Sequence, residues 1–294
     1  MAGVTLEATP RPAPVRPRRT GATAGLVARY VVLVLVVLLS IFPLVWLLLT
    51  SLRTSDELFA VPVRLLPSTV TLDQYVTVFT EYEMADYVWN SIVVSLATVA
   101  LVMVLALPCA YVLARFRLPG VKVLITVLLV MRMIPVIALA IPLFAVFSQI
   151  GLLDSVLGLV LTHAASKLPV AIWLLMAFIQ DLPKEIEESA EIDGAGVVRK
   201  LVFVVAPLIG PGLAASAVLT FLFTWNDLLI ALTLTSSEAA QTLPVGLTNF
   251  VTQFGIDWGP MSAAGVLMVV PTLLFVWFAQ GYLVKGLVAG AVRG

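Results

Sequence analysis

The chain has 294 residues, of which 61% are hydrophobic and 12% are charged, and its mean hydropathy is +1.09. Soluble domains are about half apolar and about one quarter charged, so this composition excludes an ordinary soluble protein and indicates an integral membrane protein. The formal net charge is zero, and the sequence lacks a basic patch with interleaved aromatic residues, which argues against nucleic-acid binding.

Residues 1–25 are rich in proline and arginine, a composition that predicts a disordered cytoplasmic tail. A signal peptide is the alternative, because a basic region precedes an apolar one. The apolar run from Tyr30 to Leu49 is, however, as long as a complete membrane span of about 20 residues. No small-residue cleavage site follows it closely, so we expect a retained membrane helix.

Residues 26–294 are expected to form one transmembrane domain of six helices, which makes the chain an all-α membrane protein. Each crossing of the hydrocarbon needs about 20 apolar residues, and backbone groups in lipid must bond within the segment, which favours helices. Prolines inside several of these segments predict kinks. The segments that qualify are 27–50, 89–113, 120–147, 156–179, 208–233 and 261–284.

The distribution of lysine and arginine predicts the orientation of these spans, because cytoplasmic loops carry an excess of both residues. With the N-terminus inside, thirteen of them fall on the inner side, whereas the outer segments hold only Arg53 and Arg64. This orientation places both termini and the segment 180–207 in the cytoplasm. Residues from about 51 to 88 then form a long outer loop.

The cytoplasmic segment 180–207 is longer and more charged than a hairpin between two membrane helices requires. Asp181 and Pro183 predict the start of a short helix, as an N-cap acceptor and a first-turn proline. Gly194 is expected to end it, because glycine adopts the left-handed conformation that closes a helix C-terminus. A second helix then leads to Pro207, at the entry to the next span. A helix lying on lipid is the alternative, which the acidic face disfavours.

The same segment carries a spaced motif. Glu188, Gly194, Val204 and Pro207 keep the register of E-A-A, three residues, G, nine residues and I-x-L-P. The segment therefore resembles the EAA loop of permease subunits in ATP-binding-cassette importers. The resemblance implies a coupling helix that docks in a cleft of an ATPase subunit and moves with it. The residues that it implicates in this coupling are Glu188, Ser189, Ala190, Asp193, Gly194, Ala195 and Pro207.

Several polar side chains fall inside the expected spans, where ionisable groups are costly and mark functional pathways by default. Trp225, Asn226 and Asp227 resemble the W-N-[DE] triplet of carbohydrate-importer permeases, and an aromatic ring beside hydrogen-bonding groups suits a sugar. Structural roles remain open: Asp227 can neutralise Arg132 or Lys167, His163 can be a packing residue, and Lys167 can extend toward the interface. The candidate pathway residues are Arg132, His163, Lys167, Trp225, Asn226 and Asp227.

No cofactor, nucleotide or catalytic site is expected in this chain. The phosphate-binding pattern G-x-x-x-x-G-K-[ST] is absent from the sequence, so ATP and magnesium are expected on a partner ATPase. One histidine and one cysteine, His163 and Cys109, cannot build a protein-only transition-metal site. The chain is therefore predicted to be a transport subunit that is not itself an enzyme.

Two further segments resemble one branch of the permease family. Residues 286–294 (GLVAGAVRG) and 242–247 (TLPVGL) are similar to segments of the branch that contains maltose permease G. The resemblance implies a bacterial inner-membrane importer for a sugar or oligosaccharide, with a second permease subunit, an ATPase dimer and an extracytoplasmic solute-binding protein as partners. Importers of polyamine, phosphate or amino acids are the nearest alternative. A secondary transporter, a channel or a membrane-anchored scaffold is more distant.

Overall fold

The computed structural model of the chain describes residues 20–291 except 63, 118 and 132. Most of the predicted tail, residues 1–25, and the candidate pathway residue Arg132 therefore lie outside the described residues. The described part divides into two separate units, with the boundary between Trp46 and Leu47.

The first unit contains most of helix α1 (Thr20–Ser51). No charged residue occurs between Tyr30 and Ser51, so the helix is apolar on every side, as expected of a helix surrounded by lipid. Its apolar part, Gly25–Ser51, has 27 residues, or ~40 Å at about 1.5 Å per residue, which exceeds the ~30 Å hydrocarbon core. The first predicted span thus corresponds to one continuous helix.

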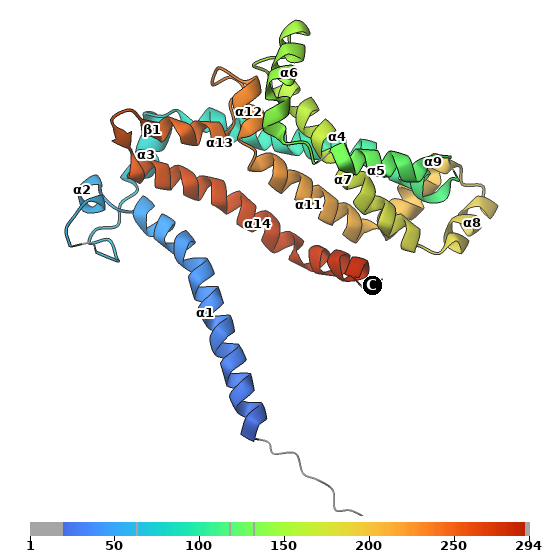
Figure 1. Cartoon of the computed structure of the whole chain (residues 1–294), viewed down its shortest axis with the longest axis horizontal. Helices are drawn as coiled ribbons and strands as arrows, with labels where there is room; N and C mark the ends of the chain where they lie inside the picture. The colour runs from blue at the N-terminus through green and yellow to red at the C-terminus, as the bar shows by residue number, and fades with distance from the viewer. Residues whose placement is uncertain (1–19, 63, 118, 132, 292–294) are drawn as a thin grey trace, which may run out of the picture. The chain divides into compact units, whose positions relative to one another are not determined.

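Four long helices dominate the second unit: α4 (Met84–Arg115), α7 (Val156–Asp181), α11 (Gly210–Trp225) and α14 (Trp258–Ala291). Helix α4 packs along α7, and α11 contacts α4, α7 and α14, so these segments lie side by side (Figure 1). Small residues such as Ala106, Ala110 and Ala164 are buried between α4 and α7, which lets the two backbones approach closely.

Shorter elements complete the second unit. A two-stranded antiparallel hairpin, β1 with β2, is an addition to the predicted all-α class. The short helices and the strands are α2 (Ser55–Leu58), α3 (Asp73–Thr80), α5 (Val121–Met131), α6 (Val136–Gln149), α8 (Lys184–Ile192), α9 (Val197–Lys200), the π-helical segment η1 (Leu201–Val205), α10 (Ala206–Leu208), α12 (Leu229–Leu234), α13 (Leu243–Gly246), the 3₁₀ turn η2 (Leu247–Phe250), β1 (Val251–Thr252) and β2 (Gly255–Ile256).

The described residues do not form six unbroken spans. Four helices are long and apolar enough to cross a membrane, or five if α9–α10 and α11 count as one span bent by 83°. The predicted span 120–147 is divided into α5 and α6, and Pro135 stands at the N-cap of α6 because proline has no backbone N–H to continue a helix. The predicted span 208–233 is interrupted after Trp225, where α11 ends.

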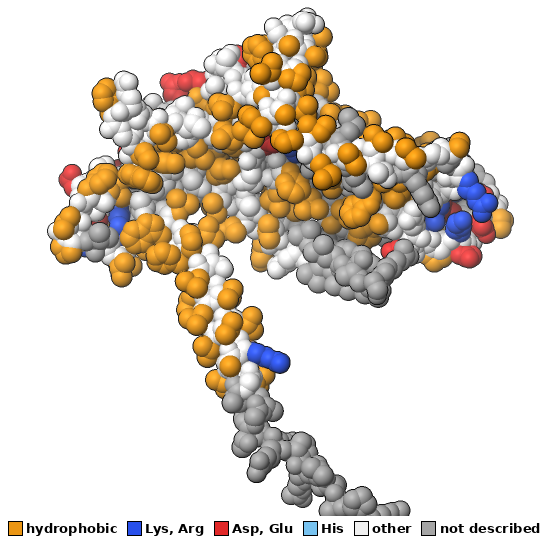
Figure 2. All heavy atoms as spheres, in the orientation of Figure 1, with side chains coloured by type: hydrophobic (Ala, Val, Ile, Leu, Met, Phe, Trp, Pro, Cys, Tyr) orange, Lys and Arg blue, Asp and Glu red, His pale blue; other side chains and the backbone are white. Residues whose placement is uncertain are grey.

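The surface of the second unit separates apolar from charged side chains. Figure 2 shows hydrophobic side chains over much of the visible face of the long helices, a mixed group of Lys, Arg, Asp and Glu at the end that carries α8 and α9, and further charged side chains near the opposite end. Large apolar side chains such as Leu96, Val104 and Trp277 are exposed on this unit, as expected where lipid or another membrane subunit is the neighbour. A mostly helical, multi-pass membrane protein is therefore confirmed.

Candidate coupling loop and transport pathway

The helix that carries the EAA-like residues is α8, and it starts differently from the prediction. Asp181 is the last residue of α7, and Leu182 is extended, with φ −74° and ψ 132°. The N-cap of α8 is Pro183, and no side chain caps this end. The prediction of Asp181 as the N-cap was wrong, because the residue before a proline avoids the helical region, which displaces the break to Leu182.

The end of α8 agrees with the prediction. Gly194 has φ +79°, the left-handed conformation that an added side chain would strain. Its N–H donates to the carbonyl of Glu191, and the N–H of Ala195 donates to the carbonyl of Ala190, both at 2.9 Å. These two bonds form a Schellman motif, which satisfies carbonyls that the helix end would leave unpaired. The turn after α8 is therefore sharply defined.

The structure brings most of the predicted coupling residues together on α8 and the turn that follows it. Glu188, Ser189, Asp193 and Gly194 are exposed, whereas Ala190 and Ala195 are half-buried. Pro207 is separate from this group, in the first turn of α10. An exposed acidic helix with a closed C-terminal turn is thus available for contact with another protein.

One acidic residue of α8 has a different environment that the sequence did not single out. Glu187 is only 7% exposed. One of its carboxylate oxygens accepts a hydrogen bond from the Tyr111 hydroxyl at 2.7 Å, and the other accepts one from Arg115 Nε at 2.7 Å. Arg115 also donates through Nη2 to the carbonyl of Leu182 at 2.8 Å. We call Glu187, Tyr111 and Arg115 the Glu187 cluster.

A second ion pair closes the loop on its other side. The buried Lys200 in α9 pairs with Glu191 at the end of α8. Lys200 also interacts electrostatically with Tyr111 of the Glu187 cluster. Four acidic residues lie close together between positions 185 and 191, so the sequence alone offers no signal that distinguishes the buried Glu187 from its exposed neighbours.

Among the candidate pathway residues, Lys167 and Asp227 form an ion pair. Lys167 Nζ lies 3.3 Å from Asp227 Oδ2. The other carboxylate oxygen of Asp227 accepts a hydrogen bond from the backbone N–H of Ile230 at 3.0 Å, so this residue also caps the start of α12. The sequence left open whether Asp227 pairs with Arg132 or Lys167, and the geometry shows the pair with Lys167.

The other residues of the Trp-Asn-Asp triplet have separate environments. Trp225 is 1% exposed, stacks on Phe221 and donates its indole N–H to the carbonyl of Met268 at 3.0 Å. Asn226 is exposed and donates to the carbonyl of Leu222. In this conformation the ring of Trp225 packs against protein, and Asn226 is the exposed member of the triplet.

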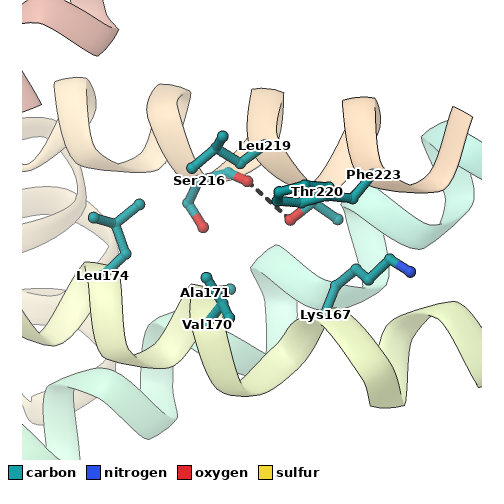
Figure 3. A pocket seen from close by; sticks show the side chains of 8 residues that line it. All are labelled: Lys167, Val170, Ala171, Leu174, Ser216, Leu219, Thr220 and Phe223. Carbon is teal, nitrogen blue, oxygen red and sulfur yellow. Dashed lines mark hydrogen bonds between the residues drawn. The ribbon is translucent and has the colours of Figure 1, made fainter. Parts of the chain in front are cut away.

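His163 and Ser216 are buried polar residues near the ion pair. His163 is 1% exposed, and its Nδ1 has no hydrogen-bond partner among the described residues; the same holds for the hydroxyl of Ser216. Ser216 and Lys167 both line a cavity between α7 and α11. The Ser216 hydroxyl points toward α7, and the Lys167 ammonium extends away from the other residues that line the cavity (Figure 3). The cavity measures about 10 Å³, room for one water molecule, so this conformation does not admit a sugar there.

The end of α7 opposite α8 carries contacts that the sequence did not predict. The carboxylate of Asp154 accepts hydrogen bonds from the N–H groups of Ser236 and Ser237 and from the Ser237 hydroxyl, at 2.9, 3.0 and 2.6 Å. Burial acts to raise the pKa of Asp154, but these hydrogen bonds outweigh it and lower the pKa below its ordinary value. On α4, the Asn90 amide donates to the carbonyls of Glu238 and Gln241. The segment between α12 and α13 is thereby tied to α4 and to the turn that precedes α7.

Known proteins resemble the chain over most of its length. Residues 103–288 match the family described as binding-protein-dependent transport system inner membrane component. The trehalose transport system permease protein SugB of Mycobacterium tuberculosis is 38% identical over 88% of this chain and 95% of its own length. The sulfoquinovosyl glycerol transport system permease protein SmoH of Agrobacterium fabrum is 32% identical over 92% of this chain and 95% of its own length.

A solved structure shares the fold. One chain of a bacterial ABC transporter involved in the import of the acidic polysaccharide alginate superposes with a TM-score of 0.79 at 22% identity, covering 92% of this chain and 99% of that chain. The family match spans more than half of the chain and includes the exposed α8, the cavity and the Lys167–Asp227 pair. The chain accordingly belongs to the family of binding-protein-dependent transport system inner membrane components.

Proposed function

We propose that this chain is the transmembrane permease subunit of an ATP-driven, binding-protein-dependent importer for a sugar or oligosaccharide. The observation that carries the proposal is the near full-length similarity to permeases whose names specify trehalose and sulfoquinovosyl glycerol transport. Both solutes are glycosides, and the resemblance of Trp225, Asn226 and Asp227 to the carbohydrate-permease triplet agrees with them.

In this proposal α8 is the surface that a partner ATPase grips. The exposed residues Glu188, Ser189, Asp193 and Gly194 make the contact, and the half-buried Ala190 and Ala195 lie in the same segment. Pro207 begins the connection from the loop into α11. ATP and magnesium are bound by the partner ATPase dimer, and this chain binds no cofactor.

The transport cycle requires two conformations of the membrane helices that differ little in free energy, so that closure of the ATPase dimer can shift their populations. A second permease subunit completes the pathway, and a solute-binding protein delivers the sugar from outside. Both termini and α8 lie in the cytoplasm, in agreement with the excess of lysine and arginine on that side. Arg132, His163, Lys167 and Asp227 belong to the pathway that opens in other steps of the cycle.

The substitution Gly194→Asp tests ATPase docking. An added Cβ at Gly194 meets no atom within 4 Å, so the substitution places bulk and charge on the exposed surface. Gly151 is a matched control, because it also has positive φ, at +70°, and open space around it, but it lies in the turn after α6. We expect G194D to insert in the membrane and to lose co-purification of the ATPase, whereas G151D retains it. Normal coupled uptake by G194D would contradict the docking assignment.

The substrate class is tested in proteoliposomes that contain the whole importer and its binding protein. We expect trehalose or a related oligosaccharide to accumulate on the side of the membrane that carries the ATPase. This accumulation should occur only when ATP is supplied on that side. If a polyamine, phosphate or an amino acid stimulated ATP hydrolysis and sugars did not, that solute would replace sugar as the assigned substrate. Uptake by the purified chain without nucleotide would instead favour a secondary transporter.

A further inference from the structure

Helix α8 is attached to the membrane helices by more than its two chain connections. Its covalent neighbours are the extended Leu182–Pro183 link to α7 and the turn at residues 193–196 that leads to α9. Of the nine residues of α8, Glu187 is the buried one. Its buried contact is with α4, a helix that is 72 residues away along the sequence at Arg115.

The geometry of the Glu187 cluster resists displacement of α8 relative to α4. Tyr111 and Arg115 are four residues apart on α4, so they project from the same face. They donate to different oxygens of one carboxylate, which restricts its rotation as well as its distance from the helix. Arg115 is bonded at the same time to the carbonyl of Leu182, so one guanidinium contacts both the short link between α7 and α8 and the first turn of α8.

The cluster combines opposite charges in a place where exchange with water is limited. Tyr111 is 3% exposed, and the side chains of Arg115 and Glu187 are each 9% exposed. Removing one partner of a buried ion pair leaves an uncompensated charge, so such a pair strongly opposes separation. The Lys200–Glu191 pair is different, because the Glu191 side chain is 59% exposed, and exposed pairs contribute little.

We infer that Glu187 is a positioning residue that transmits the displacement of α8 to the cytoplasmic end of α4. This inference rests on the proposed function, in which a partner ATPase moves α8. The exposed Glu188 faces the partner, whereas Glu187, one residue earlier, faces the membrane helices. Motion of α8 therefore reaches α4 directly through side chains, in addition to α7 and α11 through the chain.

A distance measurement tests the attachment without any ATPase. Spin labels at Asp86→Cys, at the outer end of α4, and Glu185→Cys, on the exposed face of α8, report their separation in a Cys109→Ser background, because Cys109 is the single native cysteine. We expect a narrow distance distribution with Glu187 present and a broader one in the E187Q variant. An unchanged distribution in E187Q would overturn the inference, whatever the transported solute is.

A coupling measurement tests the consequence in the complete importer. We expect E187Q to co-purify with the ATPase and to hydrolyse ATP, while solute transported per ATP falls about fivefold or more, the lower end of typical coupling between sites. E185Q makes the same chemical change on the exposed face of α8 and should keep the wild-type ratio. A wild-type ratio in E187Q, or loss of ATPase binding comparable to that of G194D, would overturn the positioning role.

If E187Q fails to accumulate in the membrane, the variant Y111F tests the inference in its place. It removes one hydrogen bond to Glu187 and leaves the ion pair with Arg115 in place. A reduced transport-to-hydrolysis ratio in Y111F supports the inference, and an unchanged ratio overturns it. Failure of the proposed function has a separate signature, because the wild-type importer would then show no ATP-dependent uptake while the spin-label result would stand unaffected.

Discussion

Asp154 shows how a single carboxylate can order the turn before a long apolar helix. It has φ +52°, a left-handed conformation that Asp tolerates better than most residues. In this position its carboxylate accepts three hydrogen bonds from Ser236 and Ser237, and its own N–H donates to the carbonyl of Leu234 at 2.7 Å. The turn before α7 and the segment after α12 are therefore one connected structure.

Acidification is expected to weaken this connection. The folded pKa of Asp154 lies below its ordinary value, so the carboxylate stabilises the folded state fully above about pH 3.9, the unfolded value, and this contribution is lost as the pH falls through the folded pKa. Near neutral pH, the D154N variant should lose roughly 1 kcal/mol of unfolding free energy for each hydrogen bond lost. It should therefore melt at a lower temperature than wild type. Thermal unfolding in detergent measures the difference.

The pH dependence provides the sharper comparison. As the pH falls below about 3.9, the melting temperature of D154N should fall less than that of wild type, because the variant lacks the titrating group. The exposed Asp86→Asn variant is the control and should follow the wild-type curve. Parallel curves for D154N and wild type would show that Asp154 does not contribute to the acid sensitivity of the fold.

At the scale of elements, Asp227 lies in the break between α11 and α12. The helical backbone hydrogen bonding is interrupted at residues 226–228, and the Asp227 carboxylate accepts a hydrogen bond from the N–H of Ile230 in the first turn of α12. The same carboxylate balances the charge of Lys167 on α7. A structural role and a pathway role are both compatible with this geometry. Paired substitutions separate them.

The D227N variant should retain the cap through its amide oxygen but remove the charge opposite Lys167, at a cost on the order of 3 kcal/mol. The double variant K167M/D227N removes both charges and should recover most of the stability, because no unbalanced buried charge remains. Thermal unfolding reports stability, and sugar uptake reports transport. A D227N melting temperature equal to that of wild type would contradict the importance of the pair; recovered stability without recovered uptake would assign the pair to the pathway.

The elements that could be predicted are those that depend on local chemistry. The C-terminal stop at Gly194 follows from backbone conformation, and the long helices follow from runs of apolar residues. The division of 120–147 into α5 and α6 was not predicted, because Pro135 within an apolar run indicates a kink or a break equally well. The burial of Glu187 depends on Tyr111 and Arg115, which are more than 70 residues away in sequence, so no local pattern could reveal it.

At the scale of the whole molecule, α7 connects the turn that contains Asp154 to the link that leads into α8. It has 26 residues and is ~39 Å long at about 1.5 Å per residue, which exceeds the ~30 Å hydrocarbon core. Asp154, which contacts Ser236 and Ser237, precedes its first residue, and α8 follows its last. If α7 crosses the membrane, these two groups lie on opposite sides of it.

Cysteine accessibility tests this arrangement in intact cells. In a Cys109→Ser background, the exposed positions Glu238→Cys and Glu185→Cys are labelled with a membrane-impermeant maleimide. We expect labelling of E238C from outside, and labelling of E185C only after the membrane is permeabilised. Labelling of both positions from the same side would refute the crossing by α7, and the reverse pattern would place α8 outside the cell.

The π-helical segment η1, Leu201–Val205, lies between the α8–α9 loop and α11. A π turn contains more residues than an α turn, because its hydrogen bonds join residues five apart instead of four. Deleting one residue there would restore the four-residue spacing of an ordinary α-helix, whereas deleting one residue from the α-helical turns on either side would turn everything before it by about 100° around the helix axis. In the proposed docking, the azimuth at which Glu188 meets a partner subunit therefore depends on the number of residues in the α-helical turns beside this segment, and the π turn is the place where one residue can be lost with the least rotation.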